Sequence, residues 1–185
     1  MKLSEMTIKE YSEILGAKKP TPGGGSALAL VCELAIDLGM MVANFTTNKK
    51  GYEEVQDEVL SYLDTLKELK QVANDLIDKD GEAYAKVVSA YKSGSKDELN
   101  DASVEACEIP YILYMIAKQA KFINERLSII GNKTIITDSL IAVELTDAVL
   151  HGSIENIKCN INGITNPDTR QKYQDLLGKE SKWNG

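Results

Sequence analysis

The run from Pro20 to Ser26, Pro-Thr-Pro-Gly-Gly-Gly-Ser, stands directly before a long apolar segment that begins at Ala27. The prolines fix the direction of the chain, the glycines allow close backbone approach, and Ser26 is a preferred helix N-cap residue. Several backbone N–H groups are therefore expected to converge on one exposed point that suits an anion or a carbonyl oxygen. A purely structural tight turn is the alternative. Three consecutive glycines are entropically expensive, however, which favours close approach of a ligand or of another helix.

A cluster of carboxylates, Asp78-Lys79-Asp80-Gly81-Glu82, lies within an otherwise apolar helical pattern. At about 100° per residue the three acids cannot share one helix face. Asp80 falls on the side of Leu76, Ile77 and Tyr84, whereas the other two project together elsewhere as a like-charged pair. A carboxylate among apolar neighbours has a raised pKa, as a general acid or base working near neutral pH needs. The alternative is a solvated run of charges on an exposed face.

Other polar residues stand where helices are expected to begin or end. Lys49 and Lys50 lie in a turn and are candidate cations for a substrate carboxylate, although lysines in polar turns are usually solvated. Asp138 follows Thr137 at an expected helix start, where a carboxylate complements the helix dipole. The single histidine, His151, precedes a glycine and is expected to end a helix.

The pattern of apolar residues predicts the elements that must position these groups. Spacings of three and four recur almost everywhere, and no run of strict alternation demands a strand. An all-α fold follows, a bundle of long antiparallel helices with shorter C-terminal helices, in a single domain of residues 1–185 whose last residues, 178–185, form a frayed tail. Pro110 is expected to kink its helix. Helices are predicted over residues 7–15, 26–46, 52–91, 96–130, 137–150, 153–162 and 167–177.

Composition narrows the classes of function. The formal net charge of -7 disfavours nucleic acid as a partner, because phosphate recognition needs a basic face. The longest apolar stretch is interrupted by Glu33 and Asp37, so no membrane partner is expected and a soluble, cytoplasmic protein is predicted. Three widely spaced cysteines and one histidine do not form a metal-ligand pattern, so no metal is expected.

Several motifs together resemble the cyclodeaminase/cyclohydrolase family of folate enzymes, and the resemblance covers nearly the whole chain. The Pro-Gly-Gly-Gly-Ser-Ala element is its most specific part. Lys133 and Thr134 stand where the family's usual Gly-Asn-Pro-Asn pattern has its last two residues. The motifs that carry the resemblance are the run from Pro20 to Ala27, Asp80-Gly81-Glu82-Ala83-Tyr84, the helix with Pro110, and the segment from Gly131-Asn132 to Thr137-Asp138.

The resemblance implies an all-helical homodimer that acts on one-carbon derivatives of tetrahydrofolate. The implied reactions are cyclisation of 5-formiminotetrahydrofolate with release of ammonia, a lyase reaction, and hydrolysis of 5,10-methenyltetrahydrofolate. It further implies that Asp80 is the catalytic acid and base. The candidate substrate-binding residues are Gly23, Gly24, Gly25, Ser26, Lys49, Lys50, Tyr84, Asn132 and Asp138.

No cofactor is expected, because the one-carbon unit keeps its oxidation level and the tetrahydrofolate derivative is itself the substrate. The alternative function is that of a helical dimeric binding or scaffold protein without catalysis. A change in the near-ultraviolet absorbance of the folate distinguishes the enzyme from the scaffold.

Overall fold

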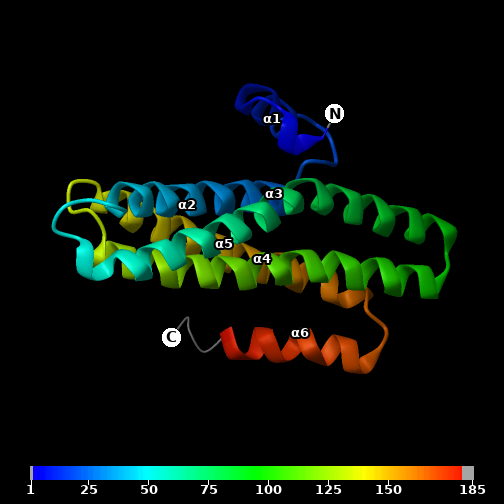
Figure 1. The fold of residues 1–185 in the computed structure, drawn as a ribbon. Helices are drawn as coiled ribbons and strands as arrows, with labels where there is room; N and C mark the ends of the chain where they lie inside the picture. The colour runs from blue at the N-terminus through cyan, green and yellow to red at the C-terminus, as the bar shows by residue number, and fades with distance from the viewer. Residues whose placement is uncertain (1, 181–185) are drawn as a thin grey trace.

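Four long helices form an antiparallel bundle in the computed structural model, which describes residues 2–180 (Figure 1). They are α2 (Gly24–Thr46), α3 (Gln56–Ser93), α4 (Lys96–Ile130) and α5 (Ile136–Asn160). Helix α2 packs between α3 and α5 and lies diagonally across from α4. No strand occurs in this part of the chain, so the prediction of an all-α fold is confirmed.

Two short helices lie outside the bundle. Helix α1 (Ile8–Leu15) stands beside the first turn of α2, and α6 (Pro167–Glu180) lies along the opposite side (Figure 1). Short 3-10 turns precede α1 at Leu3–Glu5, precede α3 at Glu53–Val55 and follow α5 at Ile161–Gly163. Helix α6 includes residues 178–180, which were expected to belong to a frayed tail, whereas residues 181–185 lie outside the described part of the chain.

The core is formed by the inward faces of the long helices. Leu66 of α3, Leu127 of α4 and Val149 of α5 are fully buried, as the spacing of three and four residues predicts. In such a closely packed core, substitution of one large side chain by alanine lowers the free energy of unfolding by about 2–5 kcal/mol. The bundle is therefore a rigid frame for the groups at its surface.

Helix ends follow the local sequence. Thr7 caps α1 through a reciprocal capping box with Glu10, and the Ser95 side chain accepts the backbone N–H of Glu98 at the start of α4. Gly94 ends α3 with φ 72°, a left-handed conformation that favours glycine. These ends agree with the predicted boundaries to within a few residues.

The predicted helix end at His151 is wrong. Helix α5 runs without interruption to Asn160 and joins the two helices predicted over 137–150 and 153–162. Gly152 is small for a packing reason: a Cβ at this position would lie 2.6 Å from Leu28 Cδ1 of α2. A glycine required by a neighbouring helix has the same sequence pattern as one that ends a helix.

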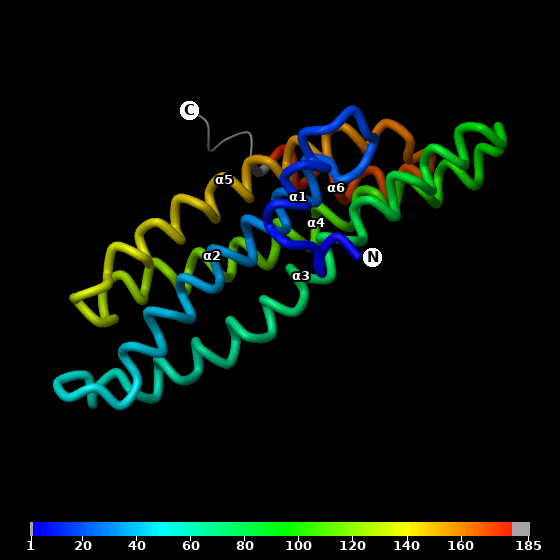
Figure 2. Tube along the Cα trace, turned by 90° about the horizontal axis from the view of Figure 1, so that it is seen from above, coloured from blue at the N-terminus to red at the C-terminus, as the bar shows by residue number. Residues whose placement is uncertain are grey.

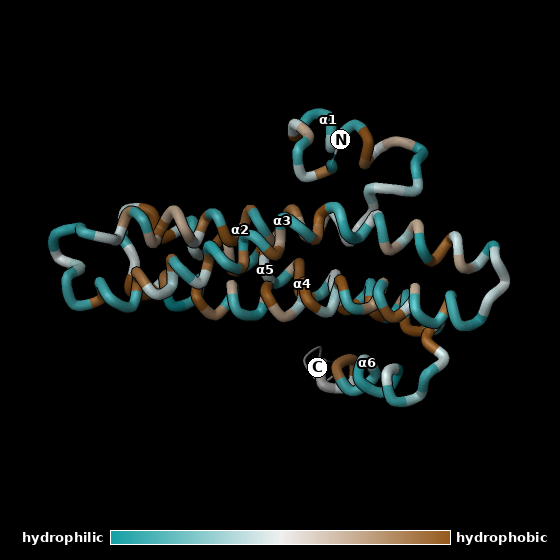
Figure 3. Tube along the Cα trace, turned by 45° about the vertical axis from the view of Figure 1, so that its right-hand side comes forward, coloured by the Kyte–Doolittle hydropathy of each residue, from teal (hydrophilic) through white to brown (hydrophobic). Residues whose placement is uncertain are grey.

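Helix α2 is unusually apolar. By length and composition alone it resembles a helix that crosses a membrane, with a mean hydropathy of 1.9. Here one of its faces is buried in the bundle, as at Cys32 and Ile36, and its two acids, Glu33 and Asp37, lie against Lys70 of α3. Hydrophobic residues recur along its whole length (Figure 3).

Candidate active site

The Asp80 carboxylate lies against the first turn of α2. Its acceptor oxygen receives the backbone N–H of Ser26, and it fills the space above Gly25, where an added Cβ would collide with Oδ1. The predicted approach of this inward-facing, half-buried acid to the glycine run is confirmed. The prediction that Ser26 is the N-cap residue of α2 is wrong. Helix α2 begins at Gly24, and Gly23 occupies the cap position. The Asp80 side chain, which belongs to α3, therefore accepts an N–H from the first turn of α2 as an N-cap side chain would.

Burial raises the pKa of Asp80, and the hydrogen bond from the Ser26 N–H partly opposes that rise. Among the described residues no lysine or arginine lies within ion-pair distance of the carboxylate. The positive end of the α2 dipole is therefore the main favourable charge that faces it. Such a group can hold a proton at a pH where an ordinary aspartate has lost it.

A chain of hydroxyl groups fixes the turn beside Asp80. The Ser26 hydroxyl donates to the Ile77 carbonyl at 2.8 Å, and the Tyr11 hydroxyl lies 3.0 Å from Ser26 Oγ. Since the single Ser26 proton is used on Ile77, Tyr11 must donate to Ser26. Burial raises the pKa of Tyr11, so its phenol stays protonated and keeps this bond. The chain joins α1, α2 and α3 around the acid.

The neighbouring carboxylates have different roles. Asp78 accepts the Leu3 N–H and the Ser4 hydroxyl, each at 2.6 Å, and so fastens the N-terminal turn to α3. Glu82 is exposed to solvent. Tyr84, one turn beyond Asp80 on α3, has 47% of its surface exposed and is accessible to a ligand. Of the three acids, Asp80 is the one that meets the glycine turn.

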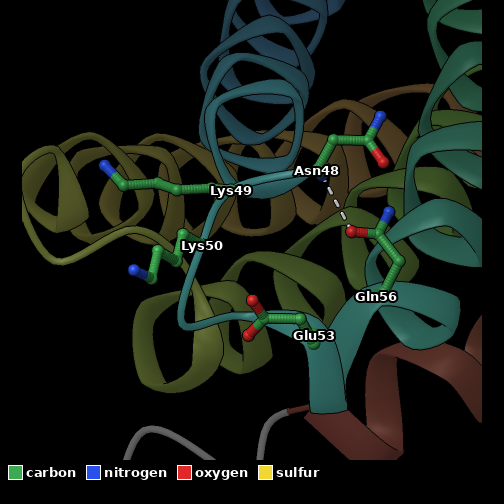
Figure 4. Close-up of a pocket in the computed structure, with 5 residues that line it drawn as sticks. All are labelled: Asn48, Lys49, Lys50, Glu53 and Gln56. Atoms are coloured by element: carbon green, nitrogen blue, oxygen red, sulfur yellow. Dashed lines mark hydrogen bonds between the residues drawn. The ribbon is translucent and has the colours of Figure 1, made fainter.

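The predicted lysines lie at the opposite end of α2. Lys49 and Lys50 follow the C-terminus of that helix, in a turn where Asn48 adopts a positive φ of 55°. A pocket of about 390 Å³ opens there, lined by Asn48, Lys49, Lys50, Glu53 and Gln56. The backbone N–H of Asn48 donates to Gln56 Oε1, and both lysine side chains extend to the same side of the turn (Figure 4).

Two further predicted residues belong to that same end. Asn132 is buried, and it donates its backbone N–H to Thr46 Oγ1 at 2.9 Å and its side-chain amide to the Phe45 carbonyl at 3.1 Å. Asp138 lies in the first turn of α5, in the position that complements a helix dipole. Asn132 therefore fastens the loop before α5 to the end of α2, next to the lysine turn.

The structure thus divides the predicted site residues into two groups. The Asp80 end contains the Gly23–Ser26 turn, Asp80 and Tyr84, and the lysine end contains Lys49, Lys50, Asn132 and Asp138. Helix α2 separates them by about 33 Å at 1.5 Å per residue. Within one chain, the two groups are therefore too far apart to contact the same reacting carbon. Sequence reasoning also missed Tyr11, which no local motif connects to the glycine run.

The family model described as formiminotransferase-cyclodeaminase matches residues 7–178 of this sequence. The chain belongs to that family. A crystal structure of formiminotetrahydrofolate cyclodeaminase from Thermotoga maritima has a TM-score of 0.92 and 34% sequence identity, covering 98% of this chain and 91% of its own. The expected resemblance to the formiminotransferase-cyclodeaminase family, and the helical fold it implied, are confirmed.

Curated relatives in the formiminotransferase-cyclodeaminase family carry two names. Methenyltetrahydrofolate cyclohydrolase from Methylorubrum extorquens is 28% identical over 167 residues, which cover 85% of this chain and 80% of that protein. Formimidoyltransferase-cyclodeaminase from Rattus norvegicus is 22% identical over 188 residues, covering 95% of this chain. The matched part is 35% of the rat protein's length.

Proposed function

We propose that this protein is a folate one-carbon enzyme that uses Asp80 as its acid and base. Its reaction is cyclisation of 5-formiminotetrahydrofolate to 5,10-methenyltetrahydrofolate with release of ammonia, or hydrolysis of 5,10-methenyltetrahydrofolate to 10-formyltetrahydrofolate. The observation that supports this function best is the Asp80 carboxylate, whose pKa is raised by burial, held against the glycine turn at the start of α2.

In the cyclodeaminase reaction N10 of the folate attacks the carbon of the protonated formimino group, whose nitrogen becomes an amino group. Asp80 accepts the proton that N10 loses as the new C–N bond forms, and passes it to the amino group. The C–N bond to that group then breaks and ammonia leaves, so the bridging carbon ends as the methenyl cation. The carboxyl group begins and ends ionised, and it takes up and releases the proton most efficiently when its pKa lies near the working pH.

In the hydrolase reaction water attacks the cationic methenyl carbon. The ionised Asp80 stabilises the cation and accepts the first proton of the attacking water. It returns this proton to N5 as the bond from the carbon to N5 breaks, and the hydroxyl proton is released to solvent as the C=O bond of the 10-formyl product forms. Both reactions pass through one tetrahedral carbon bonded to N5 and N10. One pocket with one carboxyl group can therefore serve either reaction.

The glycine turn supplies the matching binding site. The N–H groups of Gly24 and Gly25 belong to the first helical turn, and they point beyond the start of α2 without intrahelical acceptors. Gly24 is exposed, so a pterin carbonyl or a carboxylate of the substrate can reach this turn. Gly24→Val, whose added Cβ meets no atom within 4 Å, should fold normally and weaken substrate binding.

The remaining parts of the proposal concern assembly and location. The active form is a cytoplasmic homodimer that needs no metal or redox cofactor, since the one-carbon unit keeps its oxidation level. Neither nucleic acid nor a membrane is a partner. The alternative function is that of a dimeric scaffold without catalysis. In a scaffold the free-energy cost of desolvating the Asp80 carboxyl group would be offset only by its hydrogen bond to the first turn of α2.

Steady-state assays of the purified protein with both folates test the function. The near-ultraviolet absorbance of 5,10-methenyltetrahydrofolate should appear with the formimino substrate or disappear with the methenyl substrate, and Asp80→Asn should lose that activity. Which of the two changes occurs decides between lyase and hydrolase. A folded wild-type protein that changes neither substrate would support the scaffold.

A further inference from the structure

Helix α1 meets the bundle through one side chain. It lies over the N-terminal end of α2 (Figure 2). Of its eight residues, all of which the structure describes, Tyr11 alone is buried, with 6% of its surface exposed. Its apolar residues Ile8 and Leu15 are 86% and 38% exposed. A surface helix usually buries a whole stripe of apolar side chains, so the packing of α1 is directed at placing this one tyrosine.

The Tyr11 hydroxyl binds the residue that joins α2 to α3. Ser26 makes two bonds to α3, because its backbone N–H donates to Asp80 and its hydroxyl donates to the Ile77 carbonyl at 2.8 Å. The Tyr11 hydroxyl, 3.0 Å away, donates to the same Ser26 oxygen. Both side chains are buried, so water cannot easily replace this bond. Ser26 is therefore held from α3 on one side and from α1 on the other.

The glycines before Ser26 make this anchorage important. Glycine keeps more conformational freedom than any other residue, and it has no side chain that could fix the turn. At Gly23 and at Gly24 an added Cβ would meet no atom within 4 Å, so nothing packs against this side of the turn. Ser26 is the first residue of α2 whose side chain is bonded to the rest of the protein. The position of the turn relative to Asp80 depends on the bonds that Ser26 makes.

We propose that Tyr11 is a positioning residue for Asp80, and that α1 serves the active site by bringing the Tyr11 hydroxyl to Ser26. Tyr11 acts through Ser26, which sets the N–H groups of the glycine turn against the carboxylate, and it does not contact the reacting carbon. The proposal rests on the proposed function and deepens it. Tyr11 lies outside every motif that carries the family resemblance.

Tyr11 is the titratable side chain that faces Asp80 from another helix. The Asp80 charge contributes to the raised pKa of Tyr11, although burial is the larger cause. Helix α2 has two acids, Glu33 and Asp37, and both lie further along the helix against Lys70. The remaining charged residues of α1, of the following loop and of this turn of α3 are exposed to solvent or, for Asp78, bonded to the N-terminal turn. A neutral tyrosine adds no charge, so it acts on Asp80 through geometry and solvent access.

Tyr11→Phe tests the hydroxyl alone, because the ring that fills the space remains. One neutral hydrogen bond corresponds to about two- to tenfold in an equilibrium, so kcat should fall by about this factor, with KM changed less. The titration midpoint of the Asp80 carboxyl carbon, measured by NMR, should move down toward the ordinary value, because a looser turn admits water to the carboxylate. A folded variant with unchanged kcat and midpoint would overturn the proposal.

A double-mutant cycle with Ser26→Ala tests the route of the effect. This change removes the Ser26 hydroxyl and keeps the backbone N–H that Asp80 accepts. In the Ser26→Ala background Tyr11 has no partner, so adding Tyr11→Phe should change kcat by less than about twofold. Losses that multiply in the double variant would show that the two hydroxyls act separately, and would contradict the proposal.

Tyr62→Phe is the matched control for the loss of one tyrosine hydroxyl. The Tyr62 hydroxyl donates to Glu58 at 2.9 Å, and at 1.5 Å per residue its position on α3 is about 27 Å from Asp80. The variant should leave kcat and the Asp80 midpoint unchanged. If it lowered kcat as much as Tyr11→Phe does, the loss would reflect general stability and the positioning role would be refuted.

The NMR titration requires no substrate and so separates this proposal from the proposed function. A wild-type protein that acts on neither folate would remove the function. The coupling between α1 and the acid would still be supported by a midpoint that moves in Tyr11→Phe and stays in Tyr62→Phe. A midpoint that stays in both variants would refute the coupling, whatever the activity.

Discussion

The two ends of α2 illustrate different ways of building a binding group. At the Asp80 end, backbone N–H groups, a half-buried carboxylate and the hydroxyls of Ser26 and Tyr11 are held in fixed positions. At the lysine end, two flexible cations stand on an exposed turn over an open pocket. Proton transfer needs the first kind of group, whereas attraction of an anionic tail needs only the second. The comparison predicts large losses from changes at one end and modest losses from changes at the other.

Asp80→Asn should have the largest effect. Without a carboxyl group to accept and return a proton, kcat/KM should fall by about 100- to 10,000-fold. The helical circular dichroism spectrum should stay intact, because the amide oxygen that this change introduces can still accept the Ser26 N–H. Steady-state kinetics with both folates measure the loss. An unchanged kcat/KM would remove Asp80 from the mechanism.

Gly25→Ala should have the next largest effect. Its Cβ would collide with the Asp80 carboxylate and push it away from the Ser26 N–H, so kcat/KM should fall by about 100-fold. Gly24→Ala is the matched control for turnover, because its Cβ meets no atom within 4 Å, and a change in this binding turn should alter KM and leave kcat unchanged. Equal kcat values of the two variants would show that the contact between Gly25 and Asp80 is irrelevant to catalysis.

Lys49→Ala and Lys50→Ala should each have a smaller effect, confined to binding. Exposed ion pairs contribute up to about 1 kcal/mol, so KM should rise by up to about fivefold with kcat unchanged. The difference from wild type should shrink as salt is added, because exposed charges are screened. A large fall in kcat would instead place these lysines at the reacting carbon.

The smallest predicted effect concerns stability. Burial raises the pKa of Asp80 in the folded protein, so the folded state holds its proton more tightly than the unfolded chain. The free energy of unfolding contributed by this group therefore falls as pH rises from the unfolded to the folded pKa, by about 1.4 kcal/mol per pKa unit of difference. Urea denaturation of wild type and Asp80→Asn across this pH range should show the decline in the wild type alone. A decline of equal size in both proteins would assign it to other groups.

Periodicity predicted the helices and the inward side of Asp80 because a helical face is a local property of the sequence. Contacts between distant segments were not accessible in this way. Gly152 has the pattern of a helix end but makes room for Leu28, and Ser26 has the type of an N-cap residue but bonds Ile77. Tyr11 reaches the site from a separate helix. In each case the deciding partner lies far away in the sequence.

The distance between the two groups of predicted site residues follows from helix length. The family resemblance indicates which residues bind the substrate, but it does not indicate how far apart these residues lie in the fold. Lys49 lies 24 positions after Gly25 in sequence, yet the rise of α2 carries it to the other end of the bundle.

Titration of the Asp80 carboxyl carbon by NMR, assigned by its absence in Asp80→Asn and compared with the pH profile of kcat/KM, tests the central claim most directly. We expect one midpoint in both measurements, clearly above the value of about 4 for an ordinary aspartate. A carboxyl group that titrates at or below about 4, or a rate profile that does not follow its titration, would contradict the account.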